Sequence, residues 1–263
     1  MVSVTPLFVP ANRPERFTKA GASGADAVII DLEDAVAPEQ KLTARADLCA
    51  TILPVGIDIW VRINAVGTPW HVQDIKALAG LKISTVMLSK TESAADIAVV
   101  AAATGLPVIA LIETAIGLAA ARDIAQEPAT MRLAFGSIDF CTDIGASHTR
   151  AALLAARCEL VLASRLANLP PPIDGVTTAL DDAALLQDDA SYALNLGFGG
   201  KLCIHPRQIS AVKAGFRPTD ADVAWATKIM ASLDGGAASL DGAMVDTPVR
   251  LRARQILARA AMP

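Results

Sequence analysis

Carboxylates follow two neighbouring apolar runs of the chain, a pattern suited to binding a divalent cation. Glu113 closes the run Pro107–Glu113, and Asp139 comes three residues after a run that ends at Gly136. Two carboxylates supply two of the six oxygens that Mg²⁺ prefers and leave the rest to water and a chelating substrate. The structural alternative for Glu113 is a place at the positive end of a helix beginning near Thr114. Because the three histidines are far apart and no cysteine has ligand spacing, the sequence favours Mg²⁺ over a softer metal.

A positive charge stands at the end of a third apolar run. Arg62 lies in the segment Val61-Arg62-Ile63-Asn64. A guanidinium at this place suits bidentate binding of a substrate carboxylate. The alternative is an internal salt bridge to Glu33 or Asp34, and such a bridge would also orient Arg62 for a substrate.

Further polar residues occupy the ends of apolar runs along the whole chain. They are Asp31, Glu33, Asp34, Asn64, Lys90, Asp174 and His205. If the runs are parallel strands of a closed barrel, these positions converge on its carboxyl-terminal rim, where enzymes of that fold carry their catalytic residues. Charges that serve only solvation would instead scatter over helix faces.

The elements that must position these residues are short strands alternating with alanine-rich helices. The runs each contain three to five consecutive apolar residues, which is typical of parallel strands covered on both faces. Eight runs are present: Pro6–Pro10, Ala27–Glu33, Asp58–Asn64, Thr85–Lys90, Pro107–Glu113, Arg132–Gly136, Pro172–Thr177 and Lys201–His205. Helices are predicted between them at Glu39–Ile52, Ala94–Ala103 and Asp181–Leu196.

Strand–helix alternation of this length predicts an α/β protein, a (β/α)₈ TIM barrel with a C-terminal helical extension. An open doubly wound sheet is the alternative, disfavoured because no glycine-rich nucleotide loop follows the first strand. Residues 1–217 form the predicted catalytic barrel. Residues 218–263 form the extension, with helices at Pro218–Leu233 and Pro248–Ala261 and a mobile glycine-rich segment, Asp234–Gly242.

Composition excludes several classes of partner. The chain has 263 residues, 53% of them hydrophobic and only 4% aromatic, so an aliphatic core is expected. The net charge of −4, without a basic run, argues against nucleic acid and anionic membranes as partners.

The N-terminus lacks a signal-peptide pattern, and the longest apolar window, Ala98–Ile112, is too short and too interrupted to span a bilayer. The four cysteines form no C-x-x-C pair and are expected to be buried, reduced thiols of a cytoplasmic protein.

The motifs as a set resemble the citrate lyase β-subunit-like branch of the HpcH/HpaI aldolase and citrate lyase superfamily. The similarity runs in order over nearly the whole chain. It is carried by Leu7-Phe8-Val9-Pro10, Asn12–Phe17, Ile30–Val36, Val61–Asn64, Met87–Lys90, Ile112–Gly117, Phe135–Phe140, Pro172–Gly175, Gly200–Pro206 and Gly242–Pro248.

The resemblance implies a barrel enzyme that assembles as a homotrimer or a hexamer. It implies that Glu113 and Asp139 hold Mg²⁺ and that Arg62 grips the carboxylate of a 2-oxo acid. It also implies acyl-coenzyme A substrates of the malyl, citramalyl or citryl type, with Glu33 and Asp34 in the catalytic site.

Further implications concern coenzyme A and the chain's tail. The coenzyme A phosphates would meet Arg13, Arg16, Lys19 and Lys41, whose alternative is a solvated helix charge. Asp34 stands where the free-aldehyde aldolases of the superfamily carry a histidine, as in the thioester branch. Asp246 matches a carboxylate that reaches a neighbouring subunit's active site; its alternative is a cap on the last helix, before Pro248.

Two departures and the chain length bear on the choice of substrate. Family members often have Gly at the position of Ala11 and Pro at the position of Ser89. The Ala11 side chain would leave less room between the backbone and the tail of coenzyme A. The chain is shorter than dedicated citrate lyase β-subunits, which favours a free-standing lyase over a component of that complex.

The predicted reaction is Mg²⁺-dependent cleavage or formation of a carbon–carbon bond in a 3-hydroxyacyl-CoA, giving an acyl-CoA and a 2-oxo acid. Asp246 would protonate the acyl fragment in cleavage and act as the base in condensation. Three alternatives stay open: a class II pyruvate aldolase acting on free 4-hydroxy-2-oxo acids, a non-catalytic metabolite-binding or scaffold subunit, and the β subunit of a citrate lyase complex.

Overall fold

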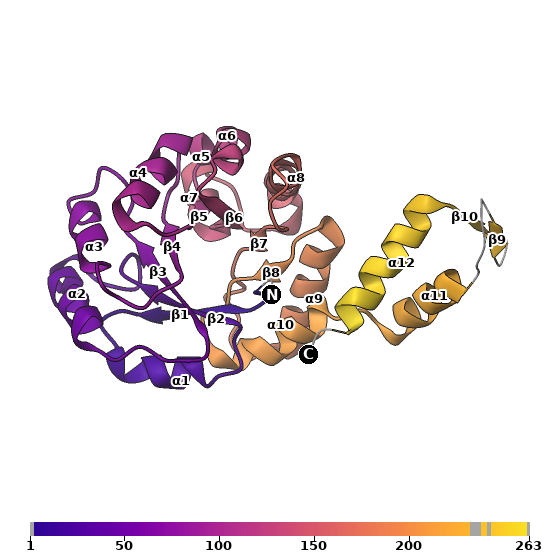
Figure 1. Cartoon of the computed structure of the whole chain (residues 1–263), viewed down its shortest axis with the longest axis horizontal. Helices are drawn as coiled ribbons and strands as arrows, with labels where there is room; N and C mark the ends of the chain where they lie inside the picture. The colour runs from indigo at the N-terminus through magenta and orange to yellow at the C-terminus, as the bar shows by residue number, and fades with distance from the viewer. Residues whose placement is uncertain (1–2, 232–237, 241–242, 262–263) are drawn as a thin grey trace.

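The computed structural model describes residues 3–231, 238–240 and 243–261, and its main body is a closed barrel (Figure 1). Eight parallel strands pair in chain order from β1 to β8. The barrel closes where Leu7 pairs with Cys203 and the Phe8 amide donates to the Cys203 carbonyl at 2.8 Å. The strands are β1 Pro6–Pro10, β2 Ala27–Asp31, β3 Asp58–Ile63, β4 Thr85–Leu88, β5 Val108–Ile112, β6 Thr130–Phe135, β7 Ile173–Asp174 and β8 Gly200–Lys201.

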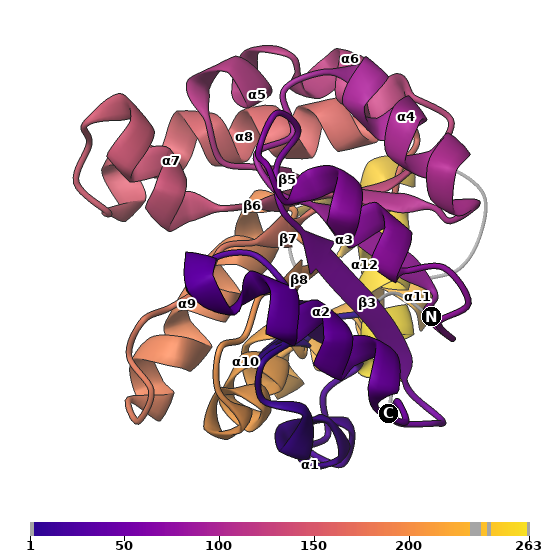
Figure 2. The same cartoon turned by 90° about the vertical axis from the view of Figure 1, so that its left-hand side faces the viewer.

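Helices surround the strands as the alternating pattern predicts (Figure 2). They are α1 Phe17–Gly21, α2 Lys41–Ala50, α3 His71–Ala77, α4 Ala94–Thr104, α5 Ala115–Ala119, α6 Ala121–Gln126, α7 Ser137–Ile144, α8 Arg150–Leu166, α9 Ala183–Leu196 and α10 Ile209–Phe216. Three short 3₁₀ turns are η1 Pro14–Arg16, η2 Pro38–Gln40 and η3 Pro206–Gln208. The (β/α)₈ barrel is therefore confirmed. No helix in the described part of the chain is long and apolar enough to cross a bilayer.

Side-chain alternation along each strand divides the core into two layers. Alternate residues such as Val28 and Ile30 pack outward against the helices, in a large cluster of buried aliphatic residues. Their neighbours, including Ile29, Trp60 and Leu111, fill the barrel interior. The period of two therefore decides which strand-end side chains point inward.

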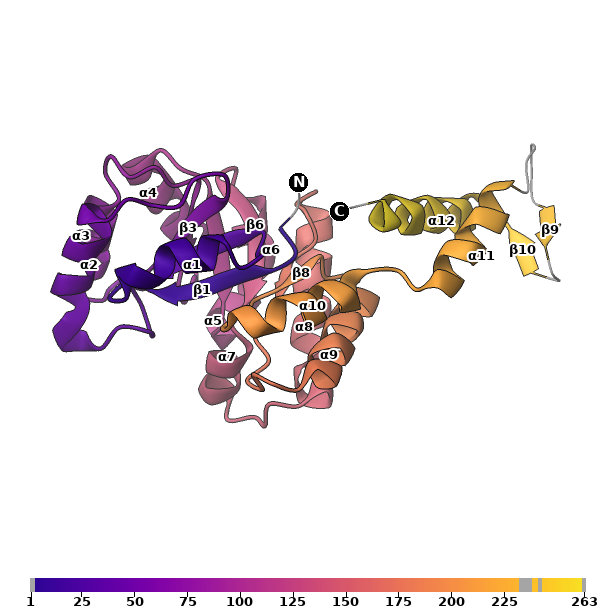
Figure 3. The same ribbon diagram turned by 90° about the horizontal axis from the view of Figure 1, so that it is seen from below.

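The C-terminal extension protrudes from the barrel (Figures 1 and 3). It consists of α11 Asp220–Ala231, the antiparallel pair β9 Ala238–Leu240 and β10 Ala243–Val245, and α12 Thr247–Ala260. Its helices share a small core of their own, which includes Ala226, Ile229 and Ile256. Both helices were predicted and the strand pair was not; most of the segment predicted to be mobile, residues 234–242, lies outside the described residues.

The cysteines only partly follow the prediction. Cys141 and Cys203 are buried, and burial raises the pKa of Cys203 to about 12. Cys49 and Cys158 are exposed, so the expectation of burial was wrong for them. Both lie on outward-facing positions of α2 and α8, where a small side chain need not be covered.

Candidate active site

Inward-facing residues at the carboxyl ends of adjacent strands build one cavity of about 390 Å³. Asp31 continues the inward alternation of Ile29 on β2, and Arg62 continues that of Trp60 on β3. Glu113 does the same one residue after β5. The walls also include Phe8, Asp34, Gly136, Ser137 and Asp139. The structure thus gathers Arg62, Asp34, Glu113 and Asp139 as the sequence predicts.

Glu113 is a buried carboxyl, 1% exposed, at the floor of this cavity. Its Oε1 accepts a 2.7 Å hydrogen bond from the Lys90 backbone amide. Burial raises the pKa of Glu113 to about 8, opposed by the positive charges of Arg62 and Lys90 and reinforced by Glu33 and Asp139. The hydrogen bond therefore fixes the position of the Glu113 carboxyl. Because its pKa is raised, this carboxyl must lose a proton before it can bind a cation.

Asp139 reaches the same point from another element. It lies in the first turn of α7, with its side chain 39% exposed. The Lys90 ammonium stands 3.8 Å from Glu113 Oε1 and 3.9 Å from Asp139 Oδ1. Both predicted metal ligands therefore face one small region of the cavity.

The local packing fits a hard cation at this place. At Gly136, between β6 and α7, a Cβ atom would stand 2.3 Å from Glu113 Oε2, so only glycine leaves this carboxylate its position. Within the described residues, no group of three or more His, Cys, Asp or Glu is arranged to hold a metal. A site of two carboxylates matches Mg²⁺, which keeps water or substrate oxygens as its other ligands.

Arg62 is fixed by a carboxylate that the sequence did not single out as its partner. Its Nε and Nη2 donate to the two oxygens of Asp31 at 2.7 and 2.6 Å. Nη1 also lies 3.1 Å from Glu33 and 3.8 Å from Asp34, and the guanidinium carbon stands 4.7 Å from the Phe8 ring centroid. Burial lowers the pKa of Arg62, but Asp31 and Glu33 more than offset this, so the pKa is raised. One hydrogen on each Nη remains for a ligand.

Glu33 and Asp34 have different environments. Glu33 is buried between Arg62 and Lys90, whose ammonium lies 2.7 Å from Glu33 Oε1. Its position is that of a residue that orients two cations. Asp34 has a side chain 54% exposed and lines the cavity.

The four basic residues assigned to coenzyme A separate into two groups. Arg13, Arg16 and Lys19 are exposed and follow β1 in the chain, and Glu15 pairs with both arginines. Lys41 is buried, and its ammonium donates to the carbonyls of Leu32 and Glu33 and to Asn64 at 2.7–2.8 Å. Lys41 therefore ties α2 to the ends of β2 and β3 and has no donor free for a phosphate, which corrects its assignment.

Asp246 lies outside the cavity of its own chain. Its side chain accepts a 3.1 Å hydrogen bond from the Val249 amide and caps α12, at the end of that helix far from the barrel (Figure 1). The capping role is therefore present. A role in catalysis requires the site of another subunit.

Two other strand-end residues have structural roles in the barrel. Asp174 is buried and accepts from Arg157 at 2.8 Å, with the Lys201 ammonium at 3.3 Å. His205 caps the 3₁₀ turn η3 by accepting from the Arg207 amide. Asp31 and Lys90 are the site residues whose partners sequence reasoning missed, although both stood among the strand-end charges.

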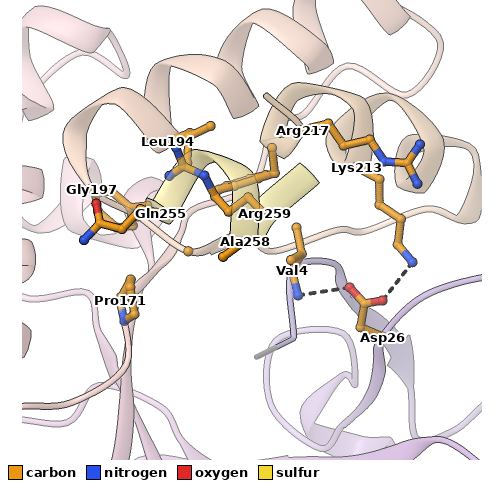
Figure 4. A pocket seen from close by; sticks show the side chains of 13 residues that line it. Val4, Asp26, Pro171, Leu194, Gly197, Lys213, Arg217, Gln255, Ala258 and Arg259 are labelled. Carbon is orange, nitrogen blue, oxygen red and sulfur yellow. Dashed lines mark hydrogen bonds and ion pairs between the residues drawn. The ribbon is translucent and has the colours of Figure 1, made fainter. Parts of the chain in front are cut away.

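A larger cavity, about 480 Å³, lies at the opposite end of the barrel (Figure 4). It is bounded by the residues that precede β2, β7 and β8 and by the last turns of α12. There Asp26 accepts from the Val4 amide at 3.0 Å and pairs with Lys213 at 2.7 Å. These contacts join α10 to the amino-terminal ends of the strands, away from the carboxylates described above.

The chain is similar in sequence to proteins of one known family. Residues 5–206 match the HpcH/HpaI aldolase/citrate lyase family, and the chain belongs to it. It is 41% identical to a citrate lyase subunit beta-like protein of Mycobacterium tuberculosis, over 97% of this chain and 94% of the relative. It is 34% identical to a (3S)-malyl-CoA thioesterase of Cereibacter sphaeroides, over 97% of this chain and 93% of the relative.

Solved structures agree with the fold. The protein CitE of M. tuberculosis in complex with magnesium, acetoacetate and coenzyme A superposes with a TM-score of 0.92 at 39% identity, covering 99% of this chain and 98% of CitE. A citrate lyase beta subunit of the same organism, complexed with oxaloacetate and magnesium, gives a TM-score of 0.76 at 40% identity, covering 82% of this chain and 98% of that structure.

Proposed function

We propose that this protein is a Mg²⁺-dependent lyase that cleaves or forms the carbon–carbon bond of a 3-hydroxyacyl-CoA, with a 2-oxo acid as the second product or substrate. The observation that carries the proposal is the convergence of Glu113, Asp139 and Arg62 on one cavity. Relatives crystallised with magnesium and with oxaloacetate, or with acetoacetate and coenzyme A, support the ligand classes.

Each residue of the site has a part in this reaction. Glu113 and Asp139 would hold Mg²⁺, which when bound polarises the substrate's hydroxyl and carboxylate oxygens. The two free N–H groups of Arg62 fix the far carboxylate oxygen, while Asp31 keeps the guanidinium plane in place. Such orientation lowers the barrier, because the bond to be broken is held in its reactive geometry.

The acyl fragment that leaves needs a proton at carbon, and its source is proposed to lie on another subunit. Asp246 of a neighbouring chain would supply this proton, and remove it in condensation. The assembly is accordingly proposed to be a trimer or a hexamer. Arg13, Arg16 and Lys19 are proposed to meet the phosphates of coenzyme A.

The test is mass-spectrometric screening of malyl-, citramalyl- and citryl-CoA in one direction, and of acyl-CoAs with glyoxylate, pyruvate or oxaloacetate in the other, with Mg²⁺ or EDTA. Turnover is expected only with Mg²⁺, and Glu113→Gln and Asp139→Asn should each lower it by about 10³-fold or more. Glu159→Gln, a carboxylate on the outside of α8, is the matched control. Full turnover in EDTA or in both site variants would overturn the proposal.

Thioester hydrolysis is a second candidate, because two of the relatives named above differ in reaction type. With malyl-CoA, a lyase releases acetyl-CoA and glyoxylate, whereas a thioesterase releases malate and free coenzyme A. The same screen therefore separates them. Including 4-hydroxy-2-oxo acids without coenzyme A tests the aldolase alternative.

A further inference from the structure

Lys90 stands at the centre of the carboxylates that the proposed function assigns to the metal. Its ammonium lies 2.7 Å from Glu33 Oε1, 3.8 Å from Glu113 Oε1 and 3.9 Å from Asp139 Oδ1. These three side chains come from three different strand ends. When all three are ionised, their mutual repulsion would separate them unless a positive charge stood between them.

No other cation of the described residues is placed to do this as directly. Arg62 gives two of its donors to Asp31 and faces Glu33 with a third. Its ion pairs are with Asp31, Glu33 and Asp34. Lys90 is therefore the side chain that links both proposed metal ligands to Glu33.

The backbone of Lys90 contributes separately. Its φ of +45° lies in the left-handed region, which among the described non-glycine residues only Asn168 shares. A lysine there is strained by about 1 kcal/mol or more, and such strain persists where the surroundings enforce it. In this conformation the Lys90 amide donates to Glu113 Oε1 at 2.7 Å. The backbone amide of Lys90 thus fixes Glu113, while its ammonium attracts Glu33 and Asp139.

We propose that Lys90 is a positioning residue that preassembles Glu33, Glu113 and Asp139 and competes with the divalent cation for Glu113 and Asp139. A cation bound by these two carboxylates would stand within a few ångströms of the ammonium, and the two positive charges would repel each other. Because its side chain is 35% exposed, Lys90 is able to withdraw towards solvent while remaining paired with Glu33. It therefore sets how tightly the site takes its metal.

The inference rests on the proposed Mg²⁺ site and is tested without turnover, on the full-length chain. At a pH above 8, where Glu113 is ionised, Mg²⁺ binding is measured by isothermal titration calorimetry, and thermal unfolding is measured in EDTA and in Mg²⁺. Lys90→Met removes the charge, Lys90→Arg keeps it, and Lys90→Gly removes the side chain while suiting the left-handed backbone. Lys82→Met, an exposed lysine before β4, is the control.

Lys90→Met is expected to bind Mg²⁺ about tenfold more tightly than the unchanged protein, because the competing charge is gone. In EDTA its melting temperature should fall by a few degrees, because the carboxylates repel one another. Lys90→Gly should also bind Mg²⁺ more tightly, Lys90→Arg should restore both values, and Lys82→Met should change neither.

Wild-type affinity or weaker binding in Lys90→Met and Lys90→Gly would overturn the positioning role while leaving the metal site in place. Absence of Mg²⁺ binding by the unchanged protein would overturn the proposed function itself. If Lys90→Met does not fold, Lys90→Gly and Lys90→Arg still decide the matter, since the role requires their affinities to differ.

Discussion

At the scale of single residues, the site depends on how Arg62 divides its donors. Asp31 takes two of them and the Nη1 group faces Glu33, so the guanidinium is held before any ligand arrives. A lysine has three donors on one atom and cannot hold a carboxylate in two places while presenting further donors to a substrate.

Arg62→Lys is expected to raise KM for the 2-oxo acid, or the acyl-CoA carrying it, by about 100-fold, equivalent to about 2.7 kcal/mol of lost binding. Arg122→Lys is the matched control. Arg122 also pairs through Nε and Nη2 with one carboxylate, that of Glu159, at 2.6 and 3.0 Å, but it does so on the outside of the barrel. Steady-state kinetics of both variants decide the point; equal KM values in the two would contradict the assigned role.

The raised pKa of Glu113, about 8, makes metal binding depend on pH. Below that pH the carboxyl is largely protonated and must lose a proton to bind a cation. The dissociation constant for Mg²⁺ should therefore fall by up to about tenfold per pH unit between pH 6 and 8 and level off above 8. Calorimetric titrations at several pH values measure this, and a constant affinity from pH 6 to 8 would exclude Glu113 as the ligand that titrates.

The same group has an effect on folding in the absence of metal. Its pKa is raised above the ordinary value of 4.5, so the folded chain binds more protons than the unfolded chain between these pH values. Its contribution to stability is fully present below about pH 4.5 and is lost as the pH rises towards 8. Urea unfolding in EDTA should show this decline, and Glu113→Gln should reduce it.

At the scale of elements, the turn from β6 to α7 decides where Glu113 can lie. A Cβ at Gly136 would stand 2.3 Å from Oε2 and 2.4 Å from Cβ of Glu113. Gly136→Ala should therefore move Glu113, weaken Mg²⁺ binding by more than about tenfold, and lower the free energy of unfolding by about 1–3 kcal/mol.

Gly105→Ala separates this effect from the general effect of replacing a glycine. Gly105 ends α4 with φ +71° and has open space around it, so alanine should cost about 1 kcal/mol of stability and leave Mg²⁺ binding unchanged. Calorimetric titration and urea unfolding of both variants measure the difference. Unchanged Mg²⁺ affinity in Gly136→Ala would contradict the proposed position of the metal.

The elements themselves were largely predictable, because buried parallel strands leave uninterrupted apolar runs. The first strand was predicted with its observed bounds, Pro6–Pro10, whereas β7 and β8 keep only two paired residues each. Pairings across the sheet were not predictable. Asp31 and Arg62 are neighbours because β2 and β3 pair in that register, and the register depends on the closed barrel.

Two lysines illustrate the same limit. Lys41 was predicted to contact the phosphates of coenzyme A, with a solvated helix charge as the alternative, yet its ammonium donates three hydrogen bonds at the ends of two strands. Lys90 was placed on the rim, but neither its left-handed backbone nor its contacts with three separate carboxylates follow from the local sequence.

At the scale of the whole molecule, the barrel and the extension have separate cores. The core shared by α11 and α12 is small, and this pair extends away from the barrel (Figure 3). Leu251 on α12 is 51% exposed. Asp246 lies at the far end of α12 and so does not enter the cavity of its own chain. These features agree with the proposal that the extension contributes Asp246 to the active site of a neighbouring subunit.

Mixing two inactive variants tests this sharing of residues directly. Asp246→Ala lacks the proposed acid and Glu113→Gln lacks a proposed metal ligand, so each alone should be nearly inactive. If every site combines Glu113 of one chain with Asp246 of the next, equal amounts reassembled at random should recover about one quarter of wild-type activity, since that fraction of sites receives both intact residues. If both residues acted within one chain, mixing would restore no activity.

Activity is assayed after the two variants are unfolded and refolded together. The control is the two variants refolded separately and then combined. Recovery confined to the co-refolded sample would establish that a complete site requires two copies of the chain.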